Sequence, residues 1–188
     1  MPRPGRVFLP DQPLHIIRRG NDRQRIFFAA DDYALYRDWL AEAARECGLA
    51  VHAYVLMTNH VHLLATPARG ESAPRTLQSL GCRYVRHVNA ARGRTGTPWE
   101  GRNRAATIEG EAHFVPCMRY IELNPVRAGM VGHPRAYRWS SYAANAEGAA
   151  DPLLTEHPLY RALGRRVMPG KAGRPPKPRG DARQMKLL

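Results

Sequence analysis

The sequence has little lysine, little cysteine and no long hydrophobic run. Only three of its 29 basic residues are lysines, and its three cysteines form no Cys-x-x-Cys pair. No apolar run approaches the roughly 18 residues that a transmembrane helix needs, so we expect no membrane role. An odd number of cysteines without a signal-peptide pattern favours reduced thiols in a cytoplasmic protein.

Arginine is abundant instead. The 188 residues carry 29 basic and 16 acidic side chains, a formal net charge of +13. Guanidinium groups pair with phosphates through two hydrogen bonds and stack on bases, so this excess predicts nucleic-acid binding. A GC-rich genome would explain arginine in place of lysine, but it would not explain the excess of base over acid.

The order of the expected elements predicts an α+β fold. Apolar alternation predicts strands at 14–18, 51–57, 60–66 and 104–109, and helical spacing predicts helices from Asp31 or Asp32 to Cys47 and from Pro74 onward. The order β-α-β-β-α-β is that of a ferredoxin-like antiparallel sheet with helices on one face and the other face open. A further helix over about 111–123 carries Tyr120.

The composition divides the chain into two parts. We expect residues 1–163 to form one folded domain, since apolar periodicity persists to about Gly164. Residues 164–188 are rich in proline and glycine and carry eight basic side chains and one acidic one. We interpret them as a disordered basic tail that adds non-specific affinity for phosphates.

The strand at 60–66 begins with two histidines in alternate positions, His60 and His62. Alternate residues of a strand share a face, so both imidazoles project to the same side. Two imidazoles leave coordination positions open, as a catalytic metal site requires. The alternative is a polar sheet surface with no metal.

Completing that pair with an amide or carboxylate oxygen and a phosphate oxygen would suit Mg²⁺ or Mn²⁺, and histidine ligation favours Mn²⁺. Zinc is the alternative metal, although no cysteine pair supports a closed structural site.

Tyr120 and Asn124 lie four residues apart and so share a helix face. Phe114, Met118 and Ile121 form the expected buried stripe, which turns Tyr120 partly off the core. Beside a metal that stabilises charge on a scissile phosphate, Tyr120 would act as a nucleophile and leave a 5′-phosphotyrosine and a 3′-hydroxyl. The alternative role for Tyr120 is packing in the core or at its rim.

Polar residues beside the first and last strands are candidate nucleic-acid contacts, although each one is equally compatible with a solvated surface. They are Arg19, Asn21, Arg23, Arg102 and Arg104. Trp99 would either stack on an unpaired base or anchor its loop. His15 would either face the site or end its strand, and we assign it no role.

Five ordered segments resemble the REP-associated tyrosine transposases, relatives of the single-tyrosine insertion-sequence transposases in the His-hydrophobic-His (HUH) endonuclease superfamily. These segments are 13–28, 53–64, 99–102, 119–128 and 139–142.

The resemblance implies a metal-dependent nuclease that cuts and rejoins single-stranded DNA at hairpin-forming repetitive palindromes. It implies that His60 and His62 bind a divalent ion, that Tyr120 attacks, and that Asn124 completes or supports the metal site. It further implies a monomer, associated with the bacterial nucleoid.

Two positions depart from the family pattern: Pro116 lies within the expected Tyr120 helix, and Asn103 stands where an aromatic residue is common. Proline removes one backbone hydrogen bond of the helix. Two rival functions are a non-catalytic ferredoxin-like nucleic-acid-binding regulator and a hydrolytic RNase, which would form no covalent adduct.

Overall fold

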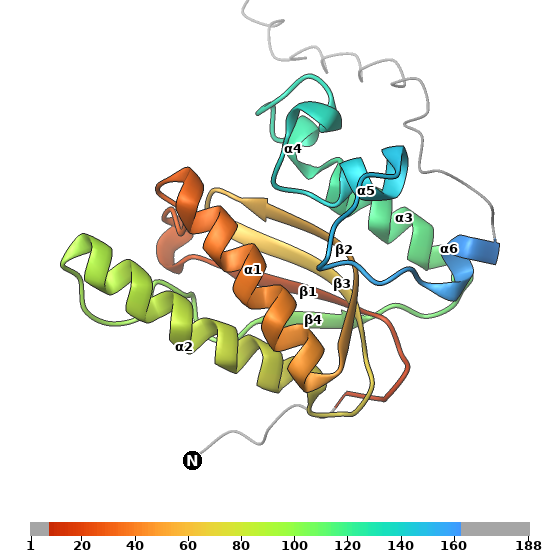
Figure 1. Cartoon of the computed structure of the whole chain (residues 1–188), viewed down its shortest axis with the longest axis horizontal. Helices are drawn as coiled ribbons and strands as arrows, with labels where there is room; N and C mark the ends of the chain where they lie inside the picture. The colour runs from red at the N-terminus through yellow and green to blue at the C-terminus, as the bar shows by residue number, and fades with distance from the viewer. Residues whose placement is uncertain (1–7, 163–188) are drawn as a thin grey trace, which may run out of the picture.

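The computed structural model describes residues 8–162, and the predicted basic tail at 164–188 lies outside this range. Its sheet contains β1 (Leu14–Arg19), β2 (Leu49–Met57), β3 (His60–Pro67) and β4 (Arg104–Thr107). The strand order is β2-β3-β1-β4 and all three pairings are antiparallel. This arrangement confirms the ferredoxin-like α+β fold predicted from the sequence (Figure 1).

Two long helices, α1 (Ala30–Cys47) and α2 (Ser72–Arg92), cover one face of the sheet (Figure 1). Helix α1 ends at Gly48, whose left-handed backbone (φ 69°) favours glycine. Helix α2 begins at Ser72, two residues before the expected start at Pro74. The main core contains large buried side chains from both helices and from alternate strand positions, among them Tyr36, Leu40, Leu80, Tyr84, Ile16 and Leu63.

The expectation that the second sheet face is open is wrong for half of that face. Helix α3 (Glu111–Glu122) packs there through the predicted stripe of Phe114, Met118 and Ile121. Its partners are Ala53, Val55, Met57 and Leu64 of β2 and β3. An apolar stripe must be buried, and this half of the sheet is itself apolar. Helix α3 continues across Pro116, which is exposed to solvent.

Short elements complete the described chain: α4 (Asn124–Arg127), α5 (Tyr142–Glu147), α6 (Pro158–Ala162), and the 3-10 turns η1 (Asn21–Arg23) and η2 (Pro134–Ala136). Across the described part of the chain, no helix combines the length and the apolar character that crossing a bilayer requires. All three cysteines are unpaired.

Candidate metal and nucleophile site

His60 and His62 lie at the start of β3, on the sheet face that carries α3. Their ring centroids are 4.9 Å apart and the ring planes are inclined at 78°. The intervening Val61 is buried in the core on the opposite face, under α1 and α2. The predicted alternation is therefore correct, and it presents two imidazoles side by side on a rigid strand.

A third histidine, His15 of β1, contacts this pair. Its Nε2 lies 2.8 Å from Nδ1 of His62, and the two rings stack with centroids 5.1 Å apart. No role was assigned to His15 from the sequence, where facing the site and ending its strand were both open, and 47 residues separate it from His62. The available signal was its place in the first strand, where it alternates with Leu14 and Ile16.

The other histidine also has its Nδ1 engaged. Nδ1 of His60 lies 2.6 Å from Oδ1 of Asn59, whose amide nitrogen donates to the carbonyl of Arg23. Oδ1 can only accept, so Nδ1 of His60 carries the proton and Nε2 carries the lone pair. With the Nδ1 atoms of His60 and His62 both occupied, the Nε2 atoms are the nitrogens left for a metal ion.

Burial favours the neutral, metal-binding form of these rings. Removal from solvent lowers the pKa of His15 and His60, and the charge of Arg19 lowers that of His60 further. Burial, followed by the neighbouring His60, His15 and Arg19, lowers the pKa of His62 to about 3. Unprotonated imidazole is the form that binds metal, so all three groups are in that form at neutral pH.

Tyr120 lies in the last turn of α3, beside the histidines. Its ring centroid is 5.8 Å from that of His62 and 5.9 Å from that of His15, both edge to face. The side chain is 40% exposed, which places it off the buried stripe as predicted. The ring therefore lies between the histidine cluster and solvent, where a substrate can reach its hydroxyl.

Asn124 joins the tyrosine to the histidines. Its Nδ2 donates to the Tyr120 carbonyl at 3.4 Å, and its side chain lies beside His60. Arg127, seven residues after Tyr120, places its guanidinium carbon 5.2 Å from the tyrosine ring centroid. Arg127 was not identified from the sequence, although its spacing of seven residues from Tyr120 was a usable signal.

Glu122 fixes the end of the helix that carries the tyrosine. Only 1% of this residue is exposed, and its Oε1 accepts hydrogen bonds from Ser141 Oγ (2.7 Å) and Asn145 Nδ2 (2.8 Å). Burial raises the pKa of this carboxyl group, and the two donors partly oppose that rise. Glu122 was not identified from the sequence either, although an acid directly after the buried Ile121 was a possible signal.

The chemistry of the donors fits an open metal site. Among residues 8–162, no three His, Cys, Asp or Glu side chains gather to hold a metal ion. The structure instead brings together two imidazoles and the Asn124 amide, which leaves coordination positions for oxygens of a substrate. A mixed nitrogen and oxygen set without thiolate suits Mn²⁺ or Mg²⁺ better than a closed zinc site.

The candidate nucleic-acid contacts fall into two groups. Arg19, Arg102 and Arg104 line a hollow of about 270 Å³ with Ile17, Glu100 and Gly101, on and beside the face that carries the histidines. Asn21 and Arg23 lie in the exposed turn η1 and do not line that hollow.

Trp99 is 4% exposed and packs near Tyr36 and Tyr84, so it anchors its loop in the core. A tryptophan buried in this way is not available to stack on a base.

Comparisons with known proteins identify the family and the fold. A family model described as IS200-like transposase matches residues 10–124. A solved structure of a REP-associated tyrosine transposase bound to a REP hairpin superposes with a TM-score of 0.64 and 18% identity, covering 93% of this chain and 98% of that chain. At this identity the likeness shows the fold.

A crystal structure of a candidate transposase from Deinococcus radiodurans R1 has a TM-score of 0.44 and 21% identity, covering 64% of this chain and 95% of that chain. No curated protein matches the sequence.

Proposed function

This chain belongs to the IS200-like transposase family, and we propose that it is a metal-dependent endonuclease and strand transferase for single-stranded DNA. The proposed substrate is a hairpin formed by repetitive palindromic DNA. The structural relative with a bound REP hairpin supports this choice, since its fold extends over nearly the whole of the described chain.

One observation carries the proposal: the exposed Tyr120 ring lies 5.8 Å from His62. In the proposed reaction, Oη of Tyr120 attacks the scissile phosphorus and a new P–O bond forms. The P–O3′ bond breaks, the 3′-oxygen takes up a proton, and the 5′-phosphate stays on the tyrosine. One phosphodiester replaces another, so the exchange needs no ATP and its reversal rejoins strands.

His60, His62 and Asn124 would hold the divalent ion, Mn²⁺ or Mg²⁺. When bound, the ion stabilises negative charge on the non-bridging phosphate oxygens. The protein itself orients the imidazoles through His15 and Asn59 and keeps them neutral through burial. Arg127 places a positive charge beside the Tyr120 ring, where it would contact negative charge on the phosphate under attack.

The hollow lined by Arg19, Arg102 and Arg104 would bind backbone phosphates of the same strand. The three guanidinium groups continue from the histidines along β1 to the edge strand β4. We propose that the protein acts on DNA as a monomer, since Tyr120 already lies beside His62 of its own chain.

The experiment is a denaturing gel. Purified protein with Mn²⁺ or Mg²⁺ is mixed with a labelled single-stranded hairpin from the repeats that flank its own gene. We expect a covalent protein–DNA adduct that disappears in Tyr120→Phe. The variant Tyr142→Phe, which removes the hydroxyl of a tyrosine in α5, should still form the adduct.

Other results would contradict the proposal in different ways. Cleavage that persists in Tyr120→Phe would assign the attack to another group or to water. Tight hairpin binding with neither cleavage nor adduct would support a non-catalytic regulator. Cleavage of RNA without an adduct would support a hydrolytic nuclease.

A further inference from the structure

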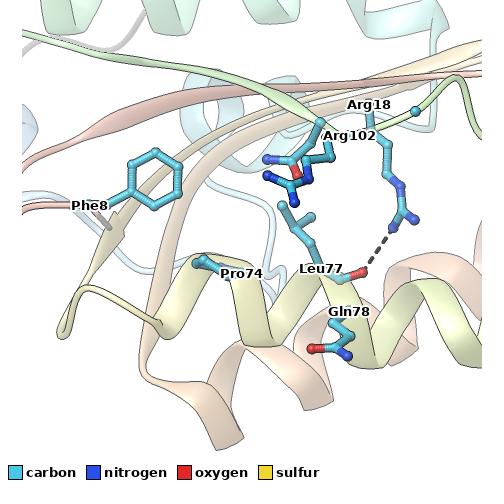
Figure 2. Close-up of a pocket in the computed structure, with 8 residues that line it drawn as sticks. Phe8, Arg18, Pro74, Leu77, Gln78 and Arg102 are labelled. Atoms are coloured by element: carbon cyan, nitrogen blue, oxygen red, sulfur yellow. Dashed lines mark hydrogen bonds between the residues drawn. The ribbon is translucent and has the colours of Figure 1, made fainter. Parts of the chain in front are cut away.

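A second cavity lies on the opposite side of the sheet edge from Tyr120. It has a volume of about 480 Å³ and lies between α2, β1 and the loop that enters β4 (Figure 2). Phe8, Pro74 and Leu77 form its apolar walls. We call it the Arg18 cavity. Its volume is within the range of roughly 300–1,000 Å³ that is typical of small-molecule sites.

Arg18 is a partly buried cation at the wall of this cavity. Its Nη1 donates to the Leu77 carbonyl at 2.9 Å, and its guanidinium carbon lies 4.1 Å from the Trp99 ring centroid. Gly81 makes room for it, because a Cβ there would lie 2.6 Å from an Arg18 nitrogen. Burial lowers the pKa of this guanidinium.

Arg18 has no counter-charge within the protein as described. Among residues 8–162, no carboxylate lies within ion-pair distance of its guanidinium. A charge that is partly removed from water is stabilised by a counter-charge or by hydrogen-bond acceptors, since desolvating it without partners costs free energy. A cavity beside such a cation therefore suits a group rich in hydrogen-bond acceptors.

The other polar groups of the cavity can both donate and accept. Gln78 and Asn103 bring amides and Arg102 brings a second guanidinium. In Figure 2, Arg102 and Arg18 extend from the sheet side toward Leu77 on α2, and Gln78 lies next to Leu77 on the same helix. Two guanidinium groups and two amides between apolar walls resemble a site for a planar, polar ring more than a site for a bare phosphate.

The Arg18 cavity adjoins the 270 Å³ hollow that we propose binds backbone phosphates. Gly101 and Arg102 line both spaces, and Arg18 and Arg19 are neighbours that project to opposite faces of β1. A DNA strand that crosses from Tyr120 over Arg19 and Arg104 would reach this cavity at the edge of the sheet. The DNA backbone would remain on the sheet face that carries Arg19, and one base would enter the cavity on the face that carries Arg18.

We propose that the Arg18 cavity binds one unpaired nucleobase of the DNA strand that passes through the catalytic site. This inference rests on the proposed function. Guanidinium groups pair best with the O6 and N7 acceptors of guanine, so guanine is the expected base. The apolar walls contact the faces of the ring, and the amides of Gln78 and Asn103 contact its edge.

The test measures base preference in the full-length protein. The probe is a library of the hairpin used above, with six random unpaired nucleotides on each side. All proteins tested also carry Tyr120→Phe, so that cleavage does not alter the library. Bound and unbound DNA are sequenced. The variants are Gln78→Met and Arg102→Ala. The control is Arg75→Ala, which removes one positive charge from an exposed position of α2 outside the cavity.

We expect one library position at which a single base is preferred by roughly 5- to 150-fold. Gln78→Met and Arg102→Ala should reduce that preference, and Arg75→Ala should retain it. Equal loss of affinity for all sequences would indicate a phosphate contact and overturn the inference, as would an unchanged preference. The adduct assay separates the two proposals: an adduct without a cavity-dependent preference overturns only the base site, and no adduct overturns the proposed function.

Discussion

Nε2 of His15 lies 2.8 Å from Nδ1 of His62, and the rings of the two histidines are stacked. One neighbour thus sets the orientation of His62, as Asn59 does for His60. Hydrogen bonds to the second nitrogen of a metal-binding imidazole fix its tautomer and its direction. His15 is therefore a positioning residue of the proposed metal site.

The first prediction concerns that contact. His15→Ala should weaken Mn²⁺ binding by about 10- to 100-fold, the usual effect of losing a partner of a histidine ligand. Isothermal titration with Mn²⁺ measures it in the absence of DNA. His87→Ala, which removes a histidine from α2 on the other side of the sheet, should bind Mn²⁺ as the wild type does. Equal affinity in His15→Ala and the wild type would contradict the positioning role.

The second prediction concerns metal removal. Chelation with EDTA should abolish hairpin cleavage and leave most hairpin binding intact, because the proposed phosphate contacts are arginines and not the metal ion. Adding Mn²⁺ in excess should restore cleavage, which a gel records. His62→Ala should not recover under the same addition. Cleavage that survives exhaustive chelation would rule out a metal-dependent reaction.

The third prediction concerns the phosphate contacts of the 270 Å³ hollow. The slope of log affinity against log salt concentration is negative, and Arg19→Ala and Arg104→Ala should each reduce its magnitude by about 0.7, the value for one phosphate contact on single-stranded DNA. Fluorescence anisotropy of a labelled hairpin at several salt concentrations gives the slope. Arg45→Ala, an exposed residue of α1, is the matched control. If Arg45→Ala changes the slope as much as the other two variants do, the DNA phosphates contact the basic surface without preference and the hollow is not their specific binding site.

The fourth prediction concerns Glu122 and pH. Burial raises the pKa of its carboxyl group in the folded state. As pH rises from the ordinary carboxyl value of about 4.3 through that raised value, the unfolded chain loses this proton first. The free energy of unfolding therefore falls over that window, whereas below the ordinary value the group imposes no such cost.

Glu122→Gln removes this titration and keeps an oxygen that can accept from Ser141 and Asn145. The stability of the variant relative to the wild type should rise as pH rises through the same window, measured by urea denaturation at pH 4 and pH 8. A difference that does not vary with pH would show that the Glu122 carboxyl titrates normally. Glu122→Ala should destabilise the protein at both pH values by about 1–3 kcal/mol, because two buried donors lose their acceptor.

The sequence by itself determined the local structure and the elements that carry His60, His62 and Tyr120. Alternation and helical spacing are local properties, so the strands, the helices and the shared direction of His60 and His62 could be read directly. The predicted stripe of Phe114, Met118 and Ile121 is buried, and Tyr120 is exposed as expected. The family resemblance rested on the same segments and is confirmed by the family model that matches residues 10–124.

Only the tertiary structure decided which elements pack against one another and which side chains come into contact. An apolar stripe predicts burial but not its partner, so the packing of α3 on the second sheet face was not predictable from its sequence. His15 with His62, Glu122 with Ser141, and Arg18 beside Gly81 are contacts between residues far apart in the chain. Such contacts depend on how the whole chain packs, and no local pattern in a single sequence encodes them.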